Sequence, residues 1–492
     1  MKKLVISALI ASLPGMALAD STSEQIAQLK AQLSAMQAKM DALEKQLDAQ
    51  QQNGMSADDA ADVKEKVSKQ ELVVDQLQKT VNEGPLAGLS VTGYLDPTFI
   101  FNKDSNSSSF EFANRTSNYN YDNSTIGDVY LDIKKTFGQG PTAPSAEVVI
   151  MPSRGAGTTL LYSEKGQDNS ILNSAQINFP LNDQYAIIAG LIPGFGGYDV
   201  TQSNQMYTIT HNLLYDFSDP GTFAGAGFTW SHGDWATKLI VGNEQNHTRG
   251  NVVSNGNGTS SNNTPSVMGR VDYTYSSAID LGGSLTVGRQ TLPTAPNNQT
   301  ANACAAGTYG YQCSSSSPYS GYAYGEADAT YNLNNETVLN AELSYGKQQK
   351  AAFNGGDAAW YGASLQGFQK WDSDSFGKMG ATLRYDYLND SKNGGGGGGI
   401  GLNATAQSGN DPNNGWGVDP ACLAANGGVP GNVCKGAVRQ AITADLLFFP
   451  TDQLTLKFEA RYDKANQSVF LRNDGSYSNY NTVLGAQMVY SF

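Results

Sequence analysis

The sequence predicts an all-β fold, a transmembrane antiparallel β-barrel of about sixteen strands preceded by an α-helical coiled coil. Three observations predict it: segments of about ten residues in which apolar and polar side chains alternate, a heptad-spaced apolar stripe ahead of them, and no long apolar run beyond the extreme N-terminus. A membrane-spanning chain without apolar helices must close its strands into a barrel. The expected parts are a signal peptide at 1–19, a stalk at 20–84 and the barrel at 85–492.

The composition excludes several other classes of protein. Charged residues make up only 15% of the 492 residues, well below an average soluble domain, and glycine supplies 54 positions. A hydrophobic content of 39% is too high for a disordered chain. The formal net charge of −14 argues against a nucleic acid as partner.

The N-terminus reads as an export signal. Lys2 and Lys3 precede an apolar stretch, and a small-residue Ala17-Leu18-Ala19 ending follows it. The alternative, a single membrane anchor, needs a longer apolar segment and gives no reason for that ending. We therefore expect cleavage before Asp20 and a protein outside the inner membrane.

The four cysteines form two local couples in Gly/Ser/Asn-rich stretches, and no histidine lies near either couple to complete a zinc site. Three pairings are possible, but short separation favours the local one, and an oxidising compartment agrees with the export signal. Two disulfides are expected, Cys304 with Cys313 and Cys422 with Cys434.

The stalk shows the spacing of a coiled coil. Apolar residues recur at alternating steps of three and four, and the positions between them are polar or alanine, so that the apolar stripe is narrow. This pattern predicts self-association; the alternative is an amphipathic helix packed on the chain's own barrel. The seam consists of Ile26, Leu29, Leu33, Met36, Met40, Leu43 and Leu47.

The barrel strands are predicted from alternation of period two. In 454–462, Leu, Leu, Phe, Ala and Tyr fall on one face and Thr, Lys, Glu and Arg on the other. Tyrosines collect at strand ends, as in an interfacial aromatic girdle, and the chain ends on an alternating segment with terminal Phe492. The predicted strands are 89–101, 125–136, 145–152, 171–180, 184–192, 222–231, 234–243, 267–276, 279–289, 321–332, 335–347, 357–370, 374–388, 438–449, 452–464 and 481–492.

The connections between these strands alternate in length. Short links, such as 181–183 and 231–233, are expected on the periplasmic side and long polar links outside the cell. An even strand count places both barrel ends on the periplasmic side, where the stalk must hang. The loop 193–221 is less monotonous than the others, and the sequence leaves open whether it folds inward as a constriction or packs outside.

A barrel of about sixteen strands leaves a water-filled lumen, which suits charged residues that a closed core would bury at high cost. The alternative is a plugged lumen with paired charges. The residues that parity assigns to the lumen carry both signs of charge: Asp128, Asp132, Lys134, Arg270, Asp272, Glu326, Asp328, Glu342, Arg384, Asp386, Asp445, Lys457, Glu459 and Arg461.

Enzymatic chemistry finds little support. The chain holds three histidines, of which only His211 is a plausible base, and no dinucleotide or haem motif. The six glycines at 394–399 lack the following helix start and Lys-Ser/Thr of a nucleotide loop. We expect no catalytic, cofactor or metal residues.

Three segments carry a resemblance: GPLAGLSVTGYLDPTFIFN (84–102), TIGDVYLDIKKTFGQGPTAPSAEVVIMPSRG (125–155) and SNQMYTITHNLLYDFSDPG (203–221). They resemble a proteobacterial family of porins of unknown function, and the architecture is similar to Gram-negative outer-membrane porins with an N-terminal periplasmic coiled coil, the DcaP-like porins. The resemblance implies a homotrimer of 16-stranded pores that pass small hydrophilic solutes, in contact with outer-membrane lipid and lipopolysaccharide. It transfers no constriction residue and no solute identity.

Two functional hypotheses follow. The first is passive diffusion of small hydrophilic solutes through the barrel. The second is an envelope tether or adhesin whose stalk acts in the periplasm and whose barrel is mainly an anchor. Conductance of the purified protein in a planar bilayer distinguishes them.

Overall fold

The computed structural model describes residues 87–104, 107–112, 126–138, 140–151, 172–244, 253–254, 259–260, 264–291, 319–398, 400, 410–411, 415–427 and 431–492. The signal peptide at 1–19 and the coiled coil at 20–84, with its seam from Ile26 to Leu47, lie outside these residues, as do Cys304 and Cys313. Those expectations stay predictions.

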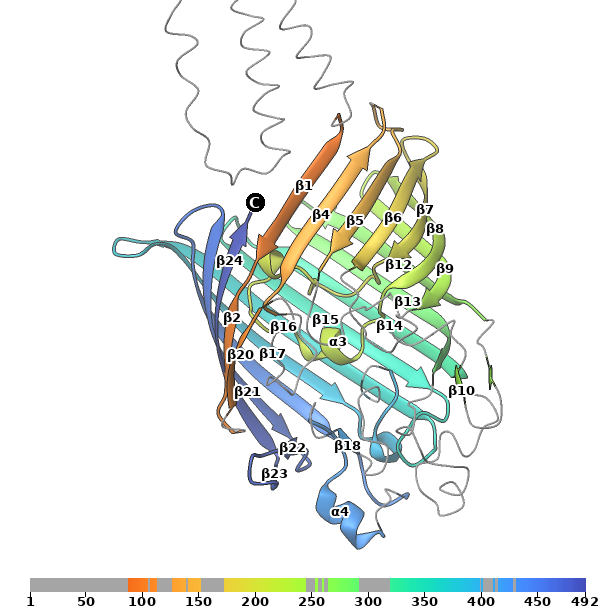
Figure 1. The fold of residues 1–492 in the computed structure, drawn as a ribbon, viewed down its shortest axis with the longest axis vertical. Helices are drawn as coiled ribbons and strands as arrows, with labels where there is room; N and C mark the ends of the chain where they lie inside the picture. Colours follow the sequence, from red (N-terminus) through yellow and green to blue (C-terminus); the bar gives the residue numbers. More distant parts are fainter. Residues whose placement is uncertain are drawn as a thin grey trace, which may run out of the picture. The chain divides into compact units, whose positions relative to one another are not determined.

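The described strands form a closed antiparallel barrel. An 18-segment sheet makes sixteen barrel strands, because the first two strands are each interrupted once (Figure 1). Its segments are β1 (Leu89–Leu95), β2 (Thr98–Asn102), β3 (Ser107–Glu111), β4 (Val129–Thr136), β5 (Ser145–Ile150), β6 (Leu172–Pro180), β7 (Tyr185–Ile192), β8 (Phe223–His232), β9 (Trp235–Glu244), β12 (Ser266–Ser276), β13 (Ile279–Thr291), β14 (Tyr319–Asn332), β15 (Thr337–Gln348), β16 (Ala358–Ser373), β17 (Gly377–Asn389), β20 (Val438–Phe448), β21 (Leu454–Ala465) and β24 (Tyr480–Ser491).

The last strand pairs with the first, which closes the sheet. In the register, Ile100 of β2 lies opposite Gly485 of β24, and Tyr94 of β1 lies opposite Ser491. Neighbouring strands elsewhere are consecutive in sequence, as in the eleven-residue register between β14 and β15. Closure removes the exposed edge that an open sheet would present.

The chain divides into two compact units. One comprises residues 93–131 and 139–491 and holds nearly all of the barrel; the other comprises residues 1–92, 132–138 and 492. In the described part of the second unit, the Thr136 N–H donates to the Gly88 carbonyl at 2.9 Å, and the Lys135 ammonium donates to the Ala87 carbonyl. The site described below lies within the first unit.

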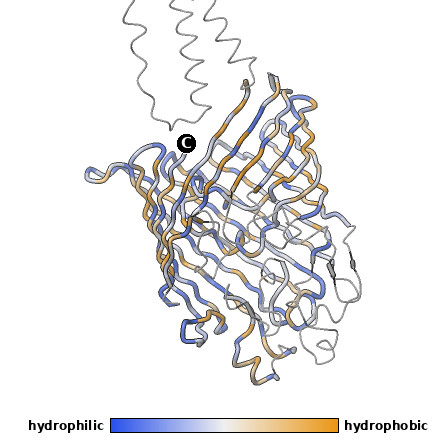
Figure 2. Tube along the Cα trace, in the orientation of Figure 1, coloured by the Kyte–Doolittle hydropathy of each residue, from blue (hydrophilic) through white to orange (hydrophobic). Residues whose placement is uncertain are grey.

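The barrel strands from β15 to β21 each have one buried and one more exposed face. On β20 the buried positions alternate with exposed ones, so that Thr443 is buried while Ile442 and Leu446 are exposed. Large apolar side chains gather on the exposed face, including Leu343 at 62% and Leu383 at 61% exposure. Figure 2 shows the same alternation of apolar and polar positions along the strands.

The strand positions agree with the period-two prediction, with two differences at the start of the barrel. The segment predicted at 89–101 is interrupted at Asp96 and Pro97, because proline cannot donate to the sheet. The strand predicted at 125–136 begins at Val129, and an unpredicted segment, β3, pairs with β2 ahead of it. Its serine-rich sequence, SSSFE, gives little alternation to detect.

The remaining described elements are short and lie in connections between strands. They are η1 (Ser203–Gln205), α3 (Leu213–Phe217), β10 (Val253–Ser254), β11 (Thr259–Ser260), η3 (Lys392–Gly394), β18 (Asn410–Asp411), β19 (Trp416–Gly417), α4 (Pro420–Ala425), β22 (Phe470–Leu471) and β23 (Tyr477–Ser478). A disulfide joins Cys422 of α4 to Cys434, with the Cα atoms 5.9 Å apart. Among the described residues, no helix is long and apolar enough to cross a membrane.

The largest apolar cluster lies beside α3. Leu213, Leu214 and Phe217 of that helix are at most 1% exposed and belong to one cluster with Trp360 and Trp416. The Phe217 and Trp416 rings meet edge to face with centroids 5.3 Å apart. This cluster packs α3 against β16 and β17.

Trp360 in this cluster needs a glycine opposite it. Gly346 is its partner in the register of β15 and β16, and a Cβ at Gly346 would lie 2.1 Å from the Trp360 ring. Only a residue without a side chain lets the indole lie flat on the neighbouring strand.

Candidate functional site

The connection between β7 and β8, residues 193–222, folds against the inner face of the barrel. We call it the inward loop. It carries η1 and α3, and its residues Thr208, Thr210 and His211 are completely buried. The structure therefore decides between the two alternatives that the sequence leaves open for this segment.

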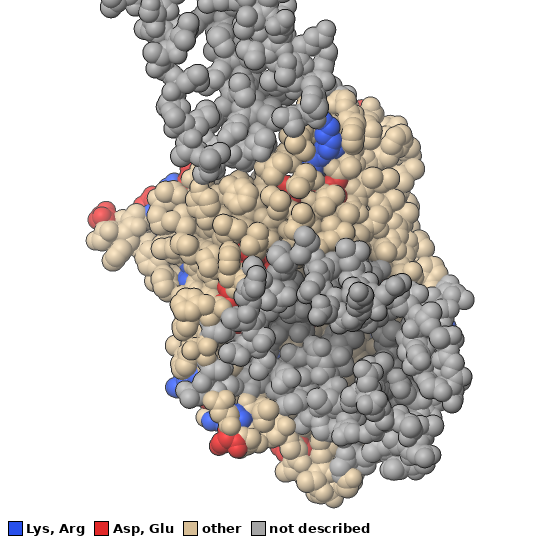
Figure 3. All heavy atoms as spheres, in the orientation of Figure 1, with Lys and Arg blue, Asp and Glu red and all other residues tan. Residues whose placement is uncertain are grey.

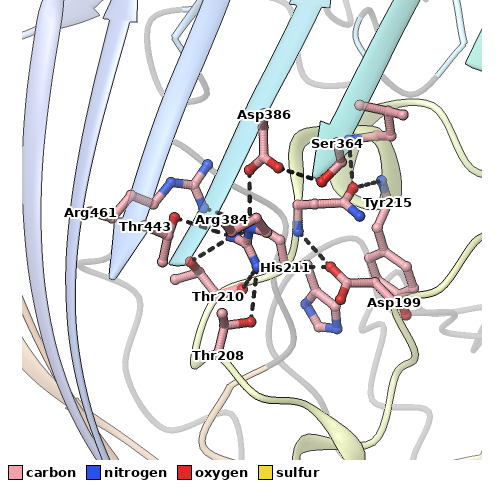
Figure 4. Close-up of polar contacts among 12 residues, drawn as sticks. Asp199, Thr208, Thr210, His211, Tyr215, Ser364, Arg384, Asp386, Thr443 and Arg461 are labelled. Carbon is pink, nitrogen blue, oxygen red and sulfur yellow. Dashed lines mark hydrogen bonds and ion pairs between the residues drawn. The ribbon is translucent and has the colours of Figure 1, made fainter. Parts of the chain in front are cut away.

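Arg384 of β17 is the central anchor of the inward loop (Figure 4). Its guanidinium donates to the Thr210 and His211 carbonyls, both at 2.7 Å, and to the Thr208 hydroxyl at 2.9 Å. Asp386 accepts from the Arg384 Nε at 3.1 Å on the same strand. The planar fork of arginine suits this task, because it offers five donors in a fixed geometry.

Two neighbouring side chains of β21 hold the same segment. Glu459 accepts hydrogen bonds from the Ile209 and Thr210 backbone N–H groups, at 2.8 and 2.9 Å, and from the Thr210 hydroxyl at 2.7 Å. The Lys457 ammonium donates to the Ser203 and Thr208 carbonyls at 2.7 and 2.9 Å. Alternating charges on one strand therefore match alternating donors and acceptors of the loop backbone.

The first interrupted strand supplies another anchor. Asp96, between β1 and β2, accepts a 2.6 Å hydrogen bond from the Ser203 hydroxyl, and the Tyr94 hydroxyl accepts from the Ser203 backbone N–H at 3.1 Å. Gln487 of β24 donates to the same carboxylate at 3.0 Å. The break in the strand thus turns Asp96 toward the loop.

Within the loop, Asn212 caps α3 by accepting from the N–H groups of Leu214 and Tyr215, both at 2.8 Å. The Asn212 N–H donates to Asp199 at 2.7 Å. Burial raises the pKa of Asp199 to about 6, although nearby Arg384 opposes the shift. The loop is therefore organised by its own polar contacts as well as by the wall.

His211 is a structural residue of this loop. Its ring stacks on Tyr215 with centroids 4.0 Å apart, and its Nε2 lies 2.8 Å from the Val200 carbonyl. Burial lowers the pKa of His211 to about 3, so the ring is neutral at physiological pH. A buried neutral imidazole that bonds to the backbone is poorly placed for the role of a general base.

The opposite wall, at β9 and β12, meets the start of the loop. Arg270 of β12 donates to the Gly196 carbonyl at 2.6 Å and pairs with Asp328 at 2.8 Å and Asp272 at 2.7 Å. Lys238 of β9, opposite Arg270 in the register, lies over the Phe195 ring at 5.1 Å and is exposed. Among the described residues, no ion pair involves Lys238.

An acidic cluster lies where the loop returns to the wall. Carboxylate oxygens of Asp219 in the loop, Glu326 of β14 and Glu342 of β15 all lie within 4.8 Å of one another. The Tyr324 hydroxyl is 2.8 Å from Asp219 and 2.7 Å from Glu326. Burial raises the pKa of Asp219 above its ordinary value.

The predicted lining residues divide into three groups by surroundings. Those on β17, β20 and β21 are covered, and those on β12 to β15 meet the ends of the loop or the acidic cluster. The remaining three lie in β4 or just before it. The covered residues, at most 5% exposed, are Arg384, Asp386, Asp445, Lys457, Glu459 and Arg461. The second group consists of Arg270, Asp272, Glu326, Asp328 and Glu342. The third group consists of buried Asp128, half-buried Asp132 and exposed Lys134. That these residues line a pore stays a prediction.

Sequence reasoning missed the anchors that carry little charge signal. Ser203 and Thr208 belong to the loop, where no strand alternation applies. Asp96 lies within the predicted strand 89–101 but is not among the charged residues assigned to the lumen. Glu244, at the end of β9, accepts from the Gly221 N–H at 2.8 Å and closes the loop. The one available sign is the polar segment DVTQSN (199–204) of the loop, which provides a carboxylate and hydroxyls for such contacts but has no alternating pattern.

Comparison with known proteins gives one family and a set of structural neighbours. The model of a family described as "Protein of unknown function (DUF3138)" matches residues 1–55 and 52–492. No curated protein matches.

Among solved structures, the barrel is similar to three outer-membrane proteins at low identity. OmpT of Vibrio cholerae is 9% identical with a TM-score of 0.45, covering 82% of this chain and 99% of that chain. An anion-selective porin from Comamonas acidovorans is 12% identical with a TM-score of 0.44, covering 82% and 99%. The DcaP channel of Acinetobacter baumannii is 11% identical with a TM-score of 0.44, covering 82% and 98%.

Proposed function

The chain belongs to the DUF3138 family, and because that family is described as of unknown function, we propose from the geometry that it is an outer-membrane porin for small hydrophilic solutes. In this proposal, solutes diffuse passively between the inward loop and the wall formed by β8 to β13. The protein is not an enzyme in this proposal and needs no cofactor.

The exposed face of the barrel supports a location in a lipid bilayer. Apolar side chains such as Leu365, at 57% exposure, and Ile177, at 55%, would each cost free energy in water, at about 25 cal/mol per Å² of apolar surface. Figure 3 shows few charged side chains over the described part of the visible barrel surface. Lipid hydrocarbon and, outside, lipopolysaccharide are the partners that suit this surface.

The asymmetric attachment of the inward loop is the observation that carries the proposal. The loop bonds to the wall at Arg384, Lys457 and Glu459, and these side chains are covered by it. On the other wall, Lys238 points inward and is exposed. A loop held against one side narrows a lumen without closing it, which is the arrangement that a diffusion channel needs.

We also propose the assembly that the sequence predicts. The stalk at 20–84 forms a periplasmic coiled coil with its seam at Ile26 to Leu47, and three chains associate. One of the similar solved structures, 8% identical in sequence, is OmpT of Vibrio cholerae in a trimer form. Cross-linking of the full chain and of a variant lacking residues 24–83 tests this: weaker trimers are expected, and a folded monomer would contradict separate barrel contacts.

Planar-bilayer recording tests the diffusion function. Purified protein should give stepwise conductance, and liposomes containing it should swell in small sugars. The charge reversal Lys238→Glu should shift the reversal potential in a KCl gradient toward cation preference, because Lys238 is an exposed inward charge without an ion pair among the described residues. The matched control Lys464→Glu changes the same charge at an exposed position of β21 whose neighbours Asp463 and Ala465 face inward, and it should shift the potential less.

An absence of conductance steps from correctly folded protein would refute the pore and favour the envelope tether. An equal shift in the two charge variants would refute the assignment of Lys238 to the passage while leaving the pore itself standing.

A further inference from the structure

The acidic cluster brings three chain segments to one point. Asp219 lies in the last part of the inward loop, Glu326 lies on β14, and Glu342 lies on β15. Glu326 is 6% and Glu342 1% exposed. Three carboxylates so close and so well covered repel one another strongly if all are ionised, so the cluster must hold either a bound cation or extra protons.

The cations of the protein nearest in the register are engaged elsewhere. Arg270 pairs with Asp272 and Asp328, and Arg384 bonds to Asp386 and to the loop carbonyls. Among the described residues, no ion pair joins a Lys or Arg to any of the three cluster carboxylates. Their negative charge is therefore not compensated by an ion pair with any Lys or Arg in the described part of the chain.

Part of the ligand capacity of the cluster is also unused. Glu326 Oε1, Glu342 Oε1 and Asp219 Oδ2 are buried atoms without a hydrogen-bond partner among the described residues. Tyr324 cannot supply the deficit. Its hydroxyl carries a single proton and lies within hydrogen-bond distance of both Asp219 and Glu326, so only one of them can accept it.

Two serines give an independent indication of a ligand. Ser284 of β13 and Ser344 of β15 are the register partners of Glu326 on either side, and all three share the inward face. Ser284 is 7% and Ser344 6% exposed, and their hydroxyl oxygens have no hydrogen-bond partner among the described residues. Orphaned buried hydroxyls are rare, and these two flank the cluster with neutral oxygen atoms.

The loop backbone is shaped to admit the carboxylates. A Cβ at Gly196 would lie 2.3 Å from Asp219 Oδ2, and a Cβ at Gly197 would lie 2.2 Å from Glu342 Oε2. Side chains at these two positions would push the carboxylates apart. The two glycines thus let the start of the loop pass directly over the cluster that holds its end.

The spacing of the oxygens favours one class of ion. Two ligands of one ion lie at most twice the metal–oxygen distance apart, about 4.2 Å for Mg²⁺ and about 4.6–5.2 Å for Ca²⁺. The cluster oxygens lie within 4.8 Å of one another, a separation within the span of two Ca²⁺ ligands, and the flexible coordination of Ca²⁺ suits three carboxylates. All the available donors are oxygens, which Ca²⁺ prefers and soft metals do not.

We propose that Asp219, Glu326 and Glu342 bind a Ca²⁺ ion that fastens the end of the inward loop to β14 and β15. The bound ion neutralises the cluster. It also joins the loop to β14 and β15, a side of the barrel to which the loop makes few hydrogen bonds. The site is independent of the porin function, since ion binding is measured without any conductance.

Tyrosine-sensitised Tb³⁺ luminescence of the purified full-length protein in detergent tests the site, with Tb³⁺ as the Ca²⁺ analogue. Tyr324 borders the cluster and is the expected energy donor. We expect saturable emission at one Tb³⁺ per chain, which Ca²⁺ displaces at lower concentration than Mg²⁺. Absence of saturable binding in the folded wild-type protein, or failure of Ca²⁺ to displace the probe, would overturn the proposal.

Glu342→Gln removes one ligand charge with almost no change of volume, and binding should weaken by at least about tenfold. Asp280→Asn is the matched control: it makes the same chemical change at an exposed inward position of β13, outside the cluster. Unchanged affinity in Glu342→Gln, or equal weakening in both folded variants, would show that the ion binds outside the cluster and would overturn the proposal.

Discussion

Replacing Arg384 with methionine tests how the inward loop is held. The side chain makes three hydrogen bonds of 2.7 to 2.9 Å to Thr208, Thr210 and His211, and it pairs with Asp386 at 3.1 Å, all without exposure to solvent. Methionine fills a similar volume but offers no donor. Two loop carbonyls and the Asp386 carboxylate then lose a charged partner in a buried place.

Breaking a buried ion pair from one side costs about 3–5 kcal/mol, and the hydrogen bonds to the loop are made by the same group, so their energies are not added again. If that cost falls on loop attachment, the detached population rises by roughly 150- to 5,000-fold, at about 1.4 kcal/mol per factor of ten. The remaining bond from Arg461 to the His211 carbonyl, at 3.2 Å, limits the effect.

The assay combines limited proteolysis of residues 193–222 with single-channel recording. Arg384→Met should make the loop protease-sensitive and the current noisier or larger, while the barrel keeps its resistance to heat in detergent. Arg384→Lys keeps the positive charge but loses the planar guanidinium, so its protease sensitivity and current should lie between those of the wild-type protein and Arg384→Met. A loop that stays protected in folded Arg384→Met, with wild-type currents, would refute the reasoning that this residue anchors it.

Three further outcomes are expected. Burial lowers the pKa of His211 from 6.5 to about 3, so the open loop binds a proton that the closed loop does not, and loop closure weakens as pH falls from 6.5 toward 3. His211→Gln should reduce this pH dependence when proteolysis of the loop is measured against pH. An unchanged pH dependence in the variant would contradict the prediction. Gly346→Ala should lower the unfolding temperature by several degrees, because a Cβ there would lie 2.1 Å from the Trp360 ring; wild-type stability by calorimetry would contradict this. Replacing Cys422 and Cys434 by serine should speed proteolysis near α4, because it removes up to about 3 kcal/mol of stabilisation from the closed loop, while the thermal unfolding temperature of the barrel stays unchanged. Unfolding of the whole barrel in this variant would show that the disulfide stabilises more than the local segment.

The strands were predictable because one local rule generates them. Alternation of period two is written in each segment, as in Leu454 to Tyr462, and needs no knowledge of partners. It failed where the local rule is suspended, at Pro97, which divides β1 from β2, and in the serine-rich β3. Parity assigns Arg384 and Glu459 to the lumen, and the structure shows both side chains buried beneath the inward loop.

The site was much less predictable, because its contacts join segments far apart in sequence. Glu459 bonds to Ile209 across 250 positions, and Arg384 bonds to Thr210 across 174. Charge alone does not say whether an inward side chain meets water or a folded loop. The cluster of Asp219, Glu326 and Glu342 is likewise assembled from three segments that show no common motif.

The sequence distance between the loop and its anchors has a consequence for biogenesis. The inward loop leaves β7, early in the barrel, whereas Arg384, Lys457 and Glu459 belong to strands that are synthesised far later. Until those strands are present, the loop can contact only earlier parts of the barrel, such as Asp96 and the strands β9, β12, β14 and β15. A barrel that lacks β17 and β21 therefore leaves the carbonyls of Thr208, Thr210 and His211 without the Lys and Arg donors that bind them in the complete barrel.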